Sequence, residues 1–125
     1  MYNYYQIVEG EVIKLNYYES IVITSQSIGE EELNKIINRT KDTIKKEGGE
    51  FIKVENWGKR KMAYELNKEK KGNYLSLHFK SEGKVISKLE KGLRIDDKIL
   101  KYMIIKVDEK QYKKKEDIPE AAAAG

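Results

Sequence analysis

The sequence predicts an α+β domain of βαββαβ order, in which a four-stranded antiparallel sheet carries two helices on one face. Three observations predict it. Four extended stretches contain continuous or alternating apolar residues, two segments between them have apolar residues at helical spacing, and a short charged stretch joins the second and third strands. Crossover connections of this kind place both helices on the same face, which is the ferredoxin-like or split βαβ arrangement. The other face of the sheet is expected to be free.

The first strand and first helix follow from a buried apolar run and an amphipathic segment. Residues 18–24 contain the run Ile21-Val22-Ile23, which is typical of a central strand. The helix opens near Ser27 or Gly29, has three acidic residues in its first turn, and stops at Gly48-Gly49. Its expected core stripe consists of Leu33, Ile36, Ile37, Thr40 and Ile44.

The second and third strands are expected to form a hairpin. The second strand is expected over residues 51–57 and 61–66, and Gly58 between these two stretches indicates a bulge or bend. Residues 67–72 are expected to be a mobile cationic loop. In residues 73–80 the alternation predicts one apolar face, with Leu75, Leu77 and Phe79, and one mixed face, with Tyr74, Ser76 and His78.

A second helix and a last strand complete the predicted domain. Val85, Ile86, Leu89 and Leu93 have helical spacing, and residues 99–107 form the last strand. The domain is expected to span residues 17–107. Residues 1–16 are an N-terminal extension, and residues 108–125 are a charged tail that has too few apolar residues to order itself.

The composition excludes several kinds of site. The chain has no cysteine and one histidine, which excludes disulfides, thiolate zinc, a cysteine nucleophile and a multi-histidine metal centre. No nucleophile has a base beside it, His78 is expected to be an exposed strand residue, and Asp96-Asp97 is expected to form a turn. We therefore expect no catalytic residue, metal or cofactor. No segment has the ~18 apolar residues of a membrane span, and the chain begins with no targeting signal, so a cytoplasmic protein is expected.

The positive charge is concentrated in the middle of the chain. Residues 17–107 contain 20 basic and 14 acidic residues, a net charge of +6, and residues 53–71 alone have a net charge of +4. A local excess of this kind is typical of a phosphate-binding surface, although a solvated face has the same composition. Within it, Arg60 is the best bidentate phosphate donor, and Trp57 and Tyr64 would stack on bases or pack on a protein partner.

Residues 57–64, Trp-Gly-Lys-Arg-Lys-Met-Ala-Tyr, resemble a motif of the bacterial small-subunit ribosomal protein six family. The family motif reads Gly-x-Arg-x-Leu-Ala-Tyr-x-Ile, and Met62 and Leu66 replace its Leu and Ile. Four further stretches resemble the family in the same order along residues 17–107: Tyr18-Glu19, Lys71-Gly72 with Tyr74, Leu89-Glu90 with Leu93-Arg94-Ile95, and Ile99 to Lys106. The family begins near Tyr17, so residues 1–16 are either a misassigned start or a lineage-specific arm.

The resemblance implies a structural protein in the platform of the small ribosomal subunit, without enzymatic activity. Such a protein binds the central domain of small-subunit (16S) ribosomal RNA together with small-subunit ribosomal protein eighteen, as a heterodimer. The implied RNA-binding residues are Lys59, Arg60, Lys61 and Arg94, followed by Lys68, Lys70 and Lys71. The residues implied for RNA or partner contact are Trp57, Tyr64 and Tyr74.

Two other functions fit the same fold. A stand-alone module for single-stranded nucleic acid would need stacking aromatics at positions 73 and 75, where the chain has Asn73 and Leu75. An enzyme of the acylphosphatase type would need an anion-cradling loop with an arginine after the first strand, and Ser25-Gln26-Ser27 has none.

Overall fold

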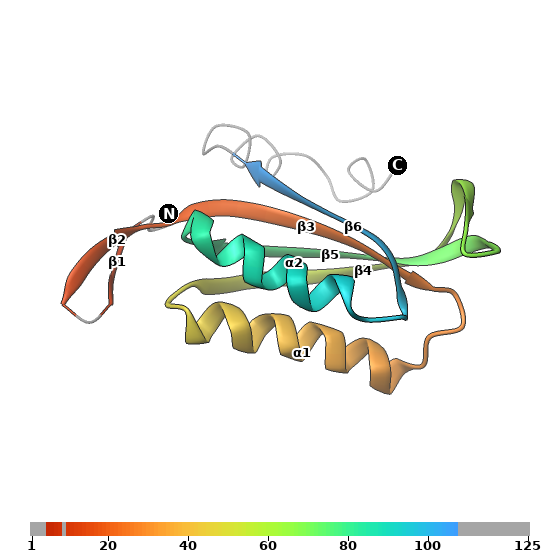
Figure 1. Ribbon diagram of the computed structural model, residues 1–125, viewed down its shortest axis with the longest axis horizontal. Coiled ribbons are helices and arrows are strands. Elements are labelled where there is room, and N and C mark those ends of the chain that lie inside the picture. Colours follow the sequence, from red (N-terminus) through yellow and green to blue (C-terminus); the bar gives the residue numbers. More distant parts are fainter. Residues whose placement is uncertain (1–4, 9, 108–125) are drawn as a thin grey trace.

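The computed structural model describes residues 5–8 and 10–107, and the predicted tail at 108–125 lies outside these residues. It confirms the βαββαβ order, with both helices on one face of an antiparallel sheet of strand order β4-β5-β3-β6 (Figure 1). The elements of this domain are β3 (Asn16–Ser25), α1 (Glu30–Lys46), β4 (Glu50–Leu66), β5 (Glu69–Ser81), the 3-10 turn η1 (Gly83–Val85), α2 (Ile86–Arg94) and β6 (Ile99–Val107).

Strand β3 is central and pairs on both sides. Its pairing with β5 runs without a register shift from Asn16 opposite Ser81 to Ser25 opposite Gly72. On its other edge β3 pairs with β6, with one irregularity between Ile23 and Thr24. Because β3 has a partner on each edge, it fixes the positions of β5 and β6 relative to each other.

The core lies between the sheet and the two helices. Tyr18 and Phe79 stack at 5.6 Å between ring centroids, and Ile44 of α1 and Leu89 of α2 pack against them. A second cluster extends the core with Val22, Leu33, Leu75, Leu77 and Leu93. Burying each such side chain contributes roughly 1.5–3 kcal/mol, so the apolar stripes predicted for both helices account for their docking on the sheet.

The β4–β5 hairpin differs from the expected loop at residues 67–72. Only Asn67 and Lys68 form the turn, with φ angles of 50° and 65°, and Glu69 already belongs to β5. Two-residue turns with positive φ at both positions match the right-handed twist of the flanking strands, so the hairpin continues almost to its tip. Lys70 and Lys71 therefore lie on a strand, and the predicted loop was wrong. The bulge predicted at Gly58 is confirmed by a register shift after Asn56 and a φ of 79°.

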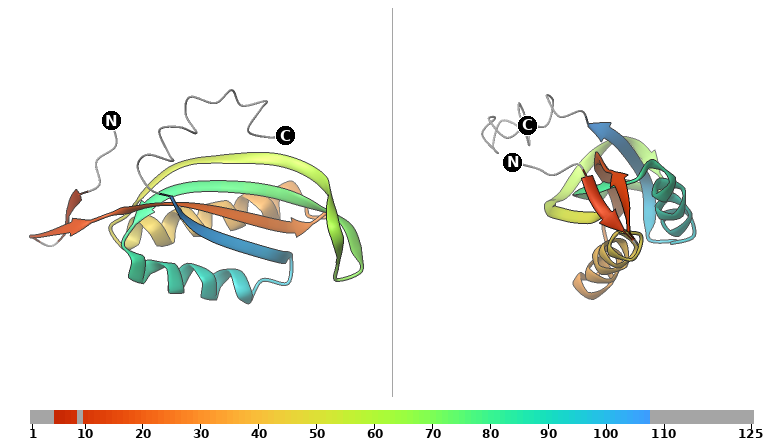
Figure 2. Two further views of the ribbon diagram at one scale, coloured as in Figure 1. Left: turned by 90° about the horizontal axis from the view of Figure 1, so that it is seen from above. Right: turned by 90° about the vertical axis from the view of Figure 1, so that its left-hand side faces the viewer.

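A separate two-stranded ribbon precedes the domain. It consists of β1 (Tyr5–Val8) and β2 (Glu11–Lys14), which pair only with each other in the described chain, and it extends from the end of the molecule opposite the hairpin tip (Figures 1 and 2). Leu15, directly after the ribbon, is buried, and Asn16 pairs with Ser81. The sheet thus begins two residues earlier than the strand expected at Tyr18.

Strand β5 approaches β3 closely at Gly72, and a substitution at this position tests the approach. A Cβ atom at this position would lie 2.5 Å from Ile23 Cγ2 and 3.2 Å from the Thr24 carbonyl oxygen. We expect Gly72→Ala to lower the free energy of unfolding by about 1–3 kcal/mol, because overpacking forces these atoms apart.

Gly92→Ala is the control, because nothing lies within 4 Å of its added Cβ in α2. It is expected to raise the free energy of unfolding by up to about 1 kcal/mol through helix propensity. Urea denaturation measures both variants, and an unchanged midpoint for Gly72→Ala would contradict the close approach.

Candidate nucleic-acid interface

Strands β4 and β5 run past the end of β3 and form a projecting arm. We define the arm as residues 59–71. Strand β3 ends at Ser25 opposite Gly72, so most of the arm has no third strand beside it. Figure 2 shows this part of the hairpin curling away at one end of the molecule. Its strand pairing is interrupted by a register shift between Lys61 and Leu66. Most of its side chains are exposed to solvent, while Met62 is buried.

Six of the seven predicted RNA-binding cations lie on the arm. Its five lysines have no carboxylate within ion-pair distance among the described residues: Lys59, Lys61, Lys68, Lys70 and Lys71. Lys61 and Lys71 lie directly opposite each other in the strand pairing. Like charges at directly opposed positions destabilise a strand pair, so an anion bound between them would stabilise the arm.

The sixth cation, Arg60, is held against Trp57. Its guanidinium carbon lies 5.5 Å from the centroid of the Trp57 ring, and its Nε donates a hydrogen bond of 3.4 Å to the Trp57 carbonyl oxygen. The Trp57 indole in turn donates through Nε1 to Glu55 Oε2 at 3.1 Å. The arginine side chain is thus half-buried and oriented, whereas the lysines are exposed.

Two contacts join the arm to the rest of the sheet. Glu69 Oε1 accepts hydrogen bonds from the Ser25 hydroxyl at 2.8 Å and from the Gln26 amide at 3.1 Å. Lys101 Nζ of β6 donates to the Tyr64 hydroxyl at 2.8 Å and lies 5.3 Å from that ring's centroid, and this hydrogen bond raises the pKa of Lys101. Both contacts limit the motion of the arm. No sequence pattern indicated that Glu69 would bind the loop after β3.

The loop after β3 has no vacant anion cradle. Ser25 and the Gln26 amide already bind the Glu69 carboxylate, and the Ser27 hydroxyl lies 3.0 Å from that of Ser25. No group of three histidine, aspartate or glutamate side chains within residues 5–8 and 10–107 is arranged to hold a metal ion.

The predicted aromatic residues lie mostly on the helix-free face of the sheet. Tyr74 and Lys101 both pair with Ile23 there, from opposite sides, and Tyr64 covers Lys101. On β6, Met103 and Ile105 remain 50% and 43% exposed. These residues form a partly apolar surface that is separate from the lysines at the tip of the arm.

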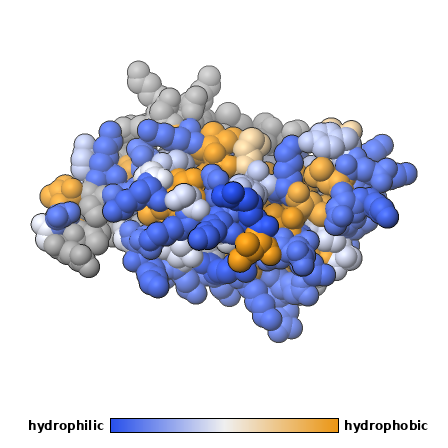
Figure 3. Space-filling model, in the orientation of Figure 1, coloured by the Kyte–Doolittle hydropathy of each residue, from blue (hydrophilic) through white to orange (hydrophobic). Residues whose placement is uncertain are grey.

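Arg94 lies outside the arm, at the C-terminal end of α2. Its side chain is exposed and lies 3.8 Å from Glu90, one helical turn earlier. Figure 1 places this helix end toward the same end of the molecule as the arm, and Figure 3 shows that hydrophilic side chains predominate over the whole of this face. Arg94 therefore adds positive charge toward this end of the molecule, from the helix side of the sheet.

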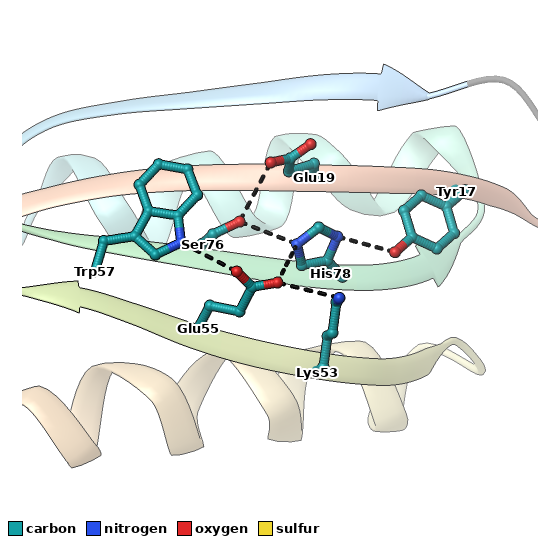
Figure 4. Close-up of polar contacts among 7 residues, drawn as sticks. All are labelled: Tyr17, Glu19, Lys53, Glu55, Trp57, Ser76 and His78. Atoms are coloured by element: carbon teal, nitrogen blue, oxygen red, sulfur yellow. Dashed lines mark hydrogen bonds and ion pairs between the residues drawn. The ribbon is translucent and has the colours of Figure 1, made fainter. Parts of the chain in front are cut away.

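His78 is not the exposed residue that was expected. It is 6% exposed, with the Tyr17 hydroxyl 2.9 Å from Nδ1 and the Ser76 hydroxyl 3.1 Å from Nε2 (Figure 4). Glu55 Oε1 lies 3.7 Å from the same Nε2. Hydrogen-bonding partners on β3 and β5, with the Glu55 carboxylate of β4 close by, satisfy the ring. These contacts explain how a histidine is accommodated on a face that the alternation left uncovered.

Glu55 contacts His78 and two further side chains and connects them. Its Oε1 also accepts from Lys53 Nζ at 3.1 Å, while Oε2 accepts from Trp57 (Figure 4). Burial raises the pKa of Glu55, but the hydrogen bonds from Trp57 and Lys53 outweigh burial and hold the pKa below its ordinary value. The carboxylate is therefore charged at neutral pH and remains an acceptor for the indole.

Comparisons with known proteins show which family the chain resembles. The family described as ribosomal protein S6 matches residues 17–106. The small ribosomal subunit protein bS6 of Thermoanaerobacter pseudethanolicus is 41% identical over 92 residues, which are 74% of this chain and 97% of that protein. That of Citrifermentans bemidjiense is 38% identical over 91 residues, which are 73% and 68% of the two chains.

A solved structure shows the same fold. The crystal structure of 30S ribosomal protein S6 from Thermotoga maritima is similar with a TM-score of 0.72 and 30% sequence identity. The similarity covers 82% of this chain and 97% of that one. No helix in the described part of the chain is long and apolar enough to cross a membrane.

The Glu69 contact makes a testable prediction about the arm. We expect Glu69→Ala to leave the fold intact but to destabilise it by about 1 kcal/mol, because two hydrogen bonds to a charged acceptor are lost at a partly exposed site. The Gln26 amide and the arm amides should then exchange faster with deuterium. Glu65→Ala, an exposed carboxylate on the same arm, is the control, and equal exchange in both variants would show that Glu69 does not fasten the arm.

Proposed function

The chain belongs to the ribosomal protein S6 family of the small ribosomal subunit, and we propose that it binds the central domain of small-subunit ribosomal RNA. We propose further that it binds as a heterodimer with small-subunit ribosomal protein eighteen. The family is structural rather than enzymatic. The protein would therefore act by shape and charge.

The observation that carries the proposal is the opposed pair Lys61 and Lys71. Neither lysine has a carboxylate partner in the described chain, and their mutual repulsion opposes the strand pairing that holds them. RNA phosphates at the arm would remove this repulsion and release their own counterions. Arg60, which is already oriented, would then fix the register of the arm on the RNA backbone.

The partner protein would cover the helix-free face of the sheet. Met103 and Ile105 on β6 are exposed apolar side chains beside the half-buried Ile21 and Ile23. An apolar surface next to a cationic arm suits a complex in which protein and RNA are bound side by side. A module that stacks single-stranded bases on this sheet is disfavoured, because Asn73 and Leu75 are both buried.

RNA binding at the arm can be measured with the full chain, the partner protein and a central-domain ribosomal RNA fragment across a salt series. We expect Arg60→Ala to weaken binding about tenfold and Lys70→Ala about twofold to threefold, because an oriented planar guanidinium loses less entropy on binding than a lysine. Equal effects would show that total charge, rather than geometry, is recognised. Tight binding to any single strand without the partner would favour the general nucleic-acid module.

Binding to the partner protein is tested by Met103→Glu. A buried carboxylate without a partner is unfavourable at an apolar interface, so this variant should weaken the heterodimer at least about tenfold in a calorimetric titration. Ile7→Glu in the ribbon introduces the same charge at another exposed apolar position and should have no effect. Unchanged heterodimer affinity in Met103→Glu would place the partner on another face.

A further inference from the structure

We infer that Glu55 and Trp57 are positioning residues for Arg60: the carboxylate fixes the indole, and the indole fixes the guanidinium for phosphate binding. The inference rests on the proposed RNA binding and assigns the residues that give the arm its one oriented cation. It also assigns Trp57 a role in holding Arg60 rather than in stacking on a base.

The bulge at Gly58 brings Trp57 and Arg60 to the same side of β4. In a regular strand, residues three apart point to opposite faces. Here Glu55 pairs with Ser76 and Arg60 with Gly72, and both partners lie on the helix-free face. The extra residue between Asn56 and Gly58 places Glu55 and Arg60 on the same face of β4. The Asn56 Oδ1 accepts a hydrogen bond from the Gly58 amide at 2.9 Å.

Glu55 is itself held firmly. Lys53 and His78 both contact its Oε1, and His78 is fixed by the Tyr17 hydroxyl on β3 (Figure 4). The remaining oxygen, Oε2, is directed at the indole. The orientation of Trp57 is therefore determined by contacts that reach across three strands of the sheet.

Trp57 holds Arg60 in two ways. The indole ring provides a π-surface at 5.5 Å from the guanidinium carbon, and the Trp57 carbonyl oxygen accepts from Arg60 Nε. Stacking on an aromatic face restricts the side chain before any ligand binds, which reduces the entropy lost on binding. The same stacking covers one face of the indole, which leaves that face unavailable to a base.

The contacts can be observed directly before any RNA is added. Trp57 is the single tryptophan of the chain, so its indole Nε1–H gives one signal in a ¹⁵N–¹H spectrum. That signal should shift as Glu55 titrates, at a pH below the ordinary range of a glutamate, and the shift should vanish in Glu55→Ala. A signal that is unchanged in Glu55→Ala would contradict the contact.

RNA affinity is then measured with the full chain, the partner protein and the central-domain RNA fragment across a salt series. We expect Arg60→Ala to weaken binding and to reduce the slope of log K against log salt by about 0.7–0.9, since one phosphate contact is lost. Trp57→Ala should weaken binding about fivefold without changing the slope, because the charge remains but its orientation is lost. Trp57→Phe, which keeps a ring, should restore most of the affinity.

Glu55 is tested against a matched control. Glu55→Ala and Glu65→Ala each remove one negative charge from β4, which by itself favours RNA binding. We expect Glu65→Ala to raise the affinity slightly and Glu55→Ala to lower it about twofold to fivefold, because only Glu55 holds the indole. Equal increases in affinity would overturn the positioning role of Glu55.

A double-mutant cycle separates positioning from direct contact. In the Arg60→Ala background, Trp57→Ala should have no further effect, because the indole then has nothing to hold. An additional loss in that background would mean that Trp57 contacts RNA itself, and the inference would fail. If Arg60→Ala alone leaves affinity and slope unchanged, the proposed phosphate contact of Arg60 fails instead. Melting temperatures of all variants show that the fold is retained.

Discussion

The unshifted pairing of β3 with β5 is the constraint on which the other features depend. It runs over all ten residues of β3, and a slip by one residue would exchange the two faces of the strand. Phe79 would then leave the core, and His78 would enter it. The point at which the pairing ends, Ser25 opposite Gly72, also decides where β4 and β5 become a projecting arm. The pairing of β3 with β5 therefore determines both which residues enter the core and where the projecting arm begins.

The arm combines repulsion among its own charges with restraint by its neighbours. Its lysines lack carboxylate partners in the described chain, while Glu69, one of the two acidic residues of the arm, is bound to the loop after β3. The carboxylate that would neutralise a lysine is thus used as an anchor. The result is a cationic surface of defined shape, which, under the proposed RNA binding, would favour a ligand with a fixed arrangement of phosphates over a flexible polyanion.

The sequence predicts the order of elements well because periodicity reports which residues share a face. The core stripe of α1 follows from the spacing of its apolar residues, and the bulge at Gly58 follows from a glycine inside a strand pattern. The turn at Asn67-Lys68 does not, because a lysine with positive φ is uncommon and no glycine marks the position. The burial of His78 was also missed, since alternation cannot show what covers a face. Glu55 and Glu69 looked like simple counter-charges, and only the fold shows which groups they bind.

The pairing of β3 with β6 joins the first and last strands of the domain, with Tyr17 opposite Val107. Contacts between residues so distant in sequence form slowly, whereas a hairpin closed by a two-residue turn forms within microseconds. During synthesis the β4–β5 hairpin can therefore fold well before β6 leaves the ribosome. Until then β3 has one unpaired edge, which is open to pairing with another chain. The last strand of the domain completes the sheet, so the newly made domain passes its period of greatest aggregation risk only after β6 has paired with β3.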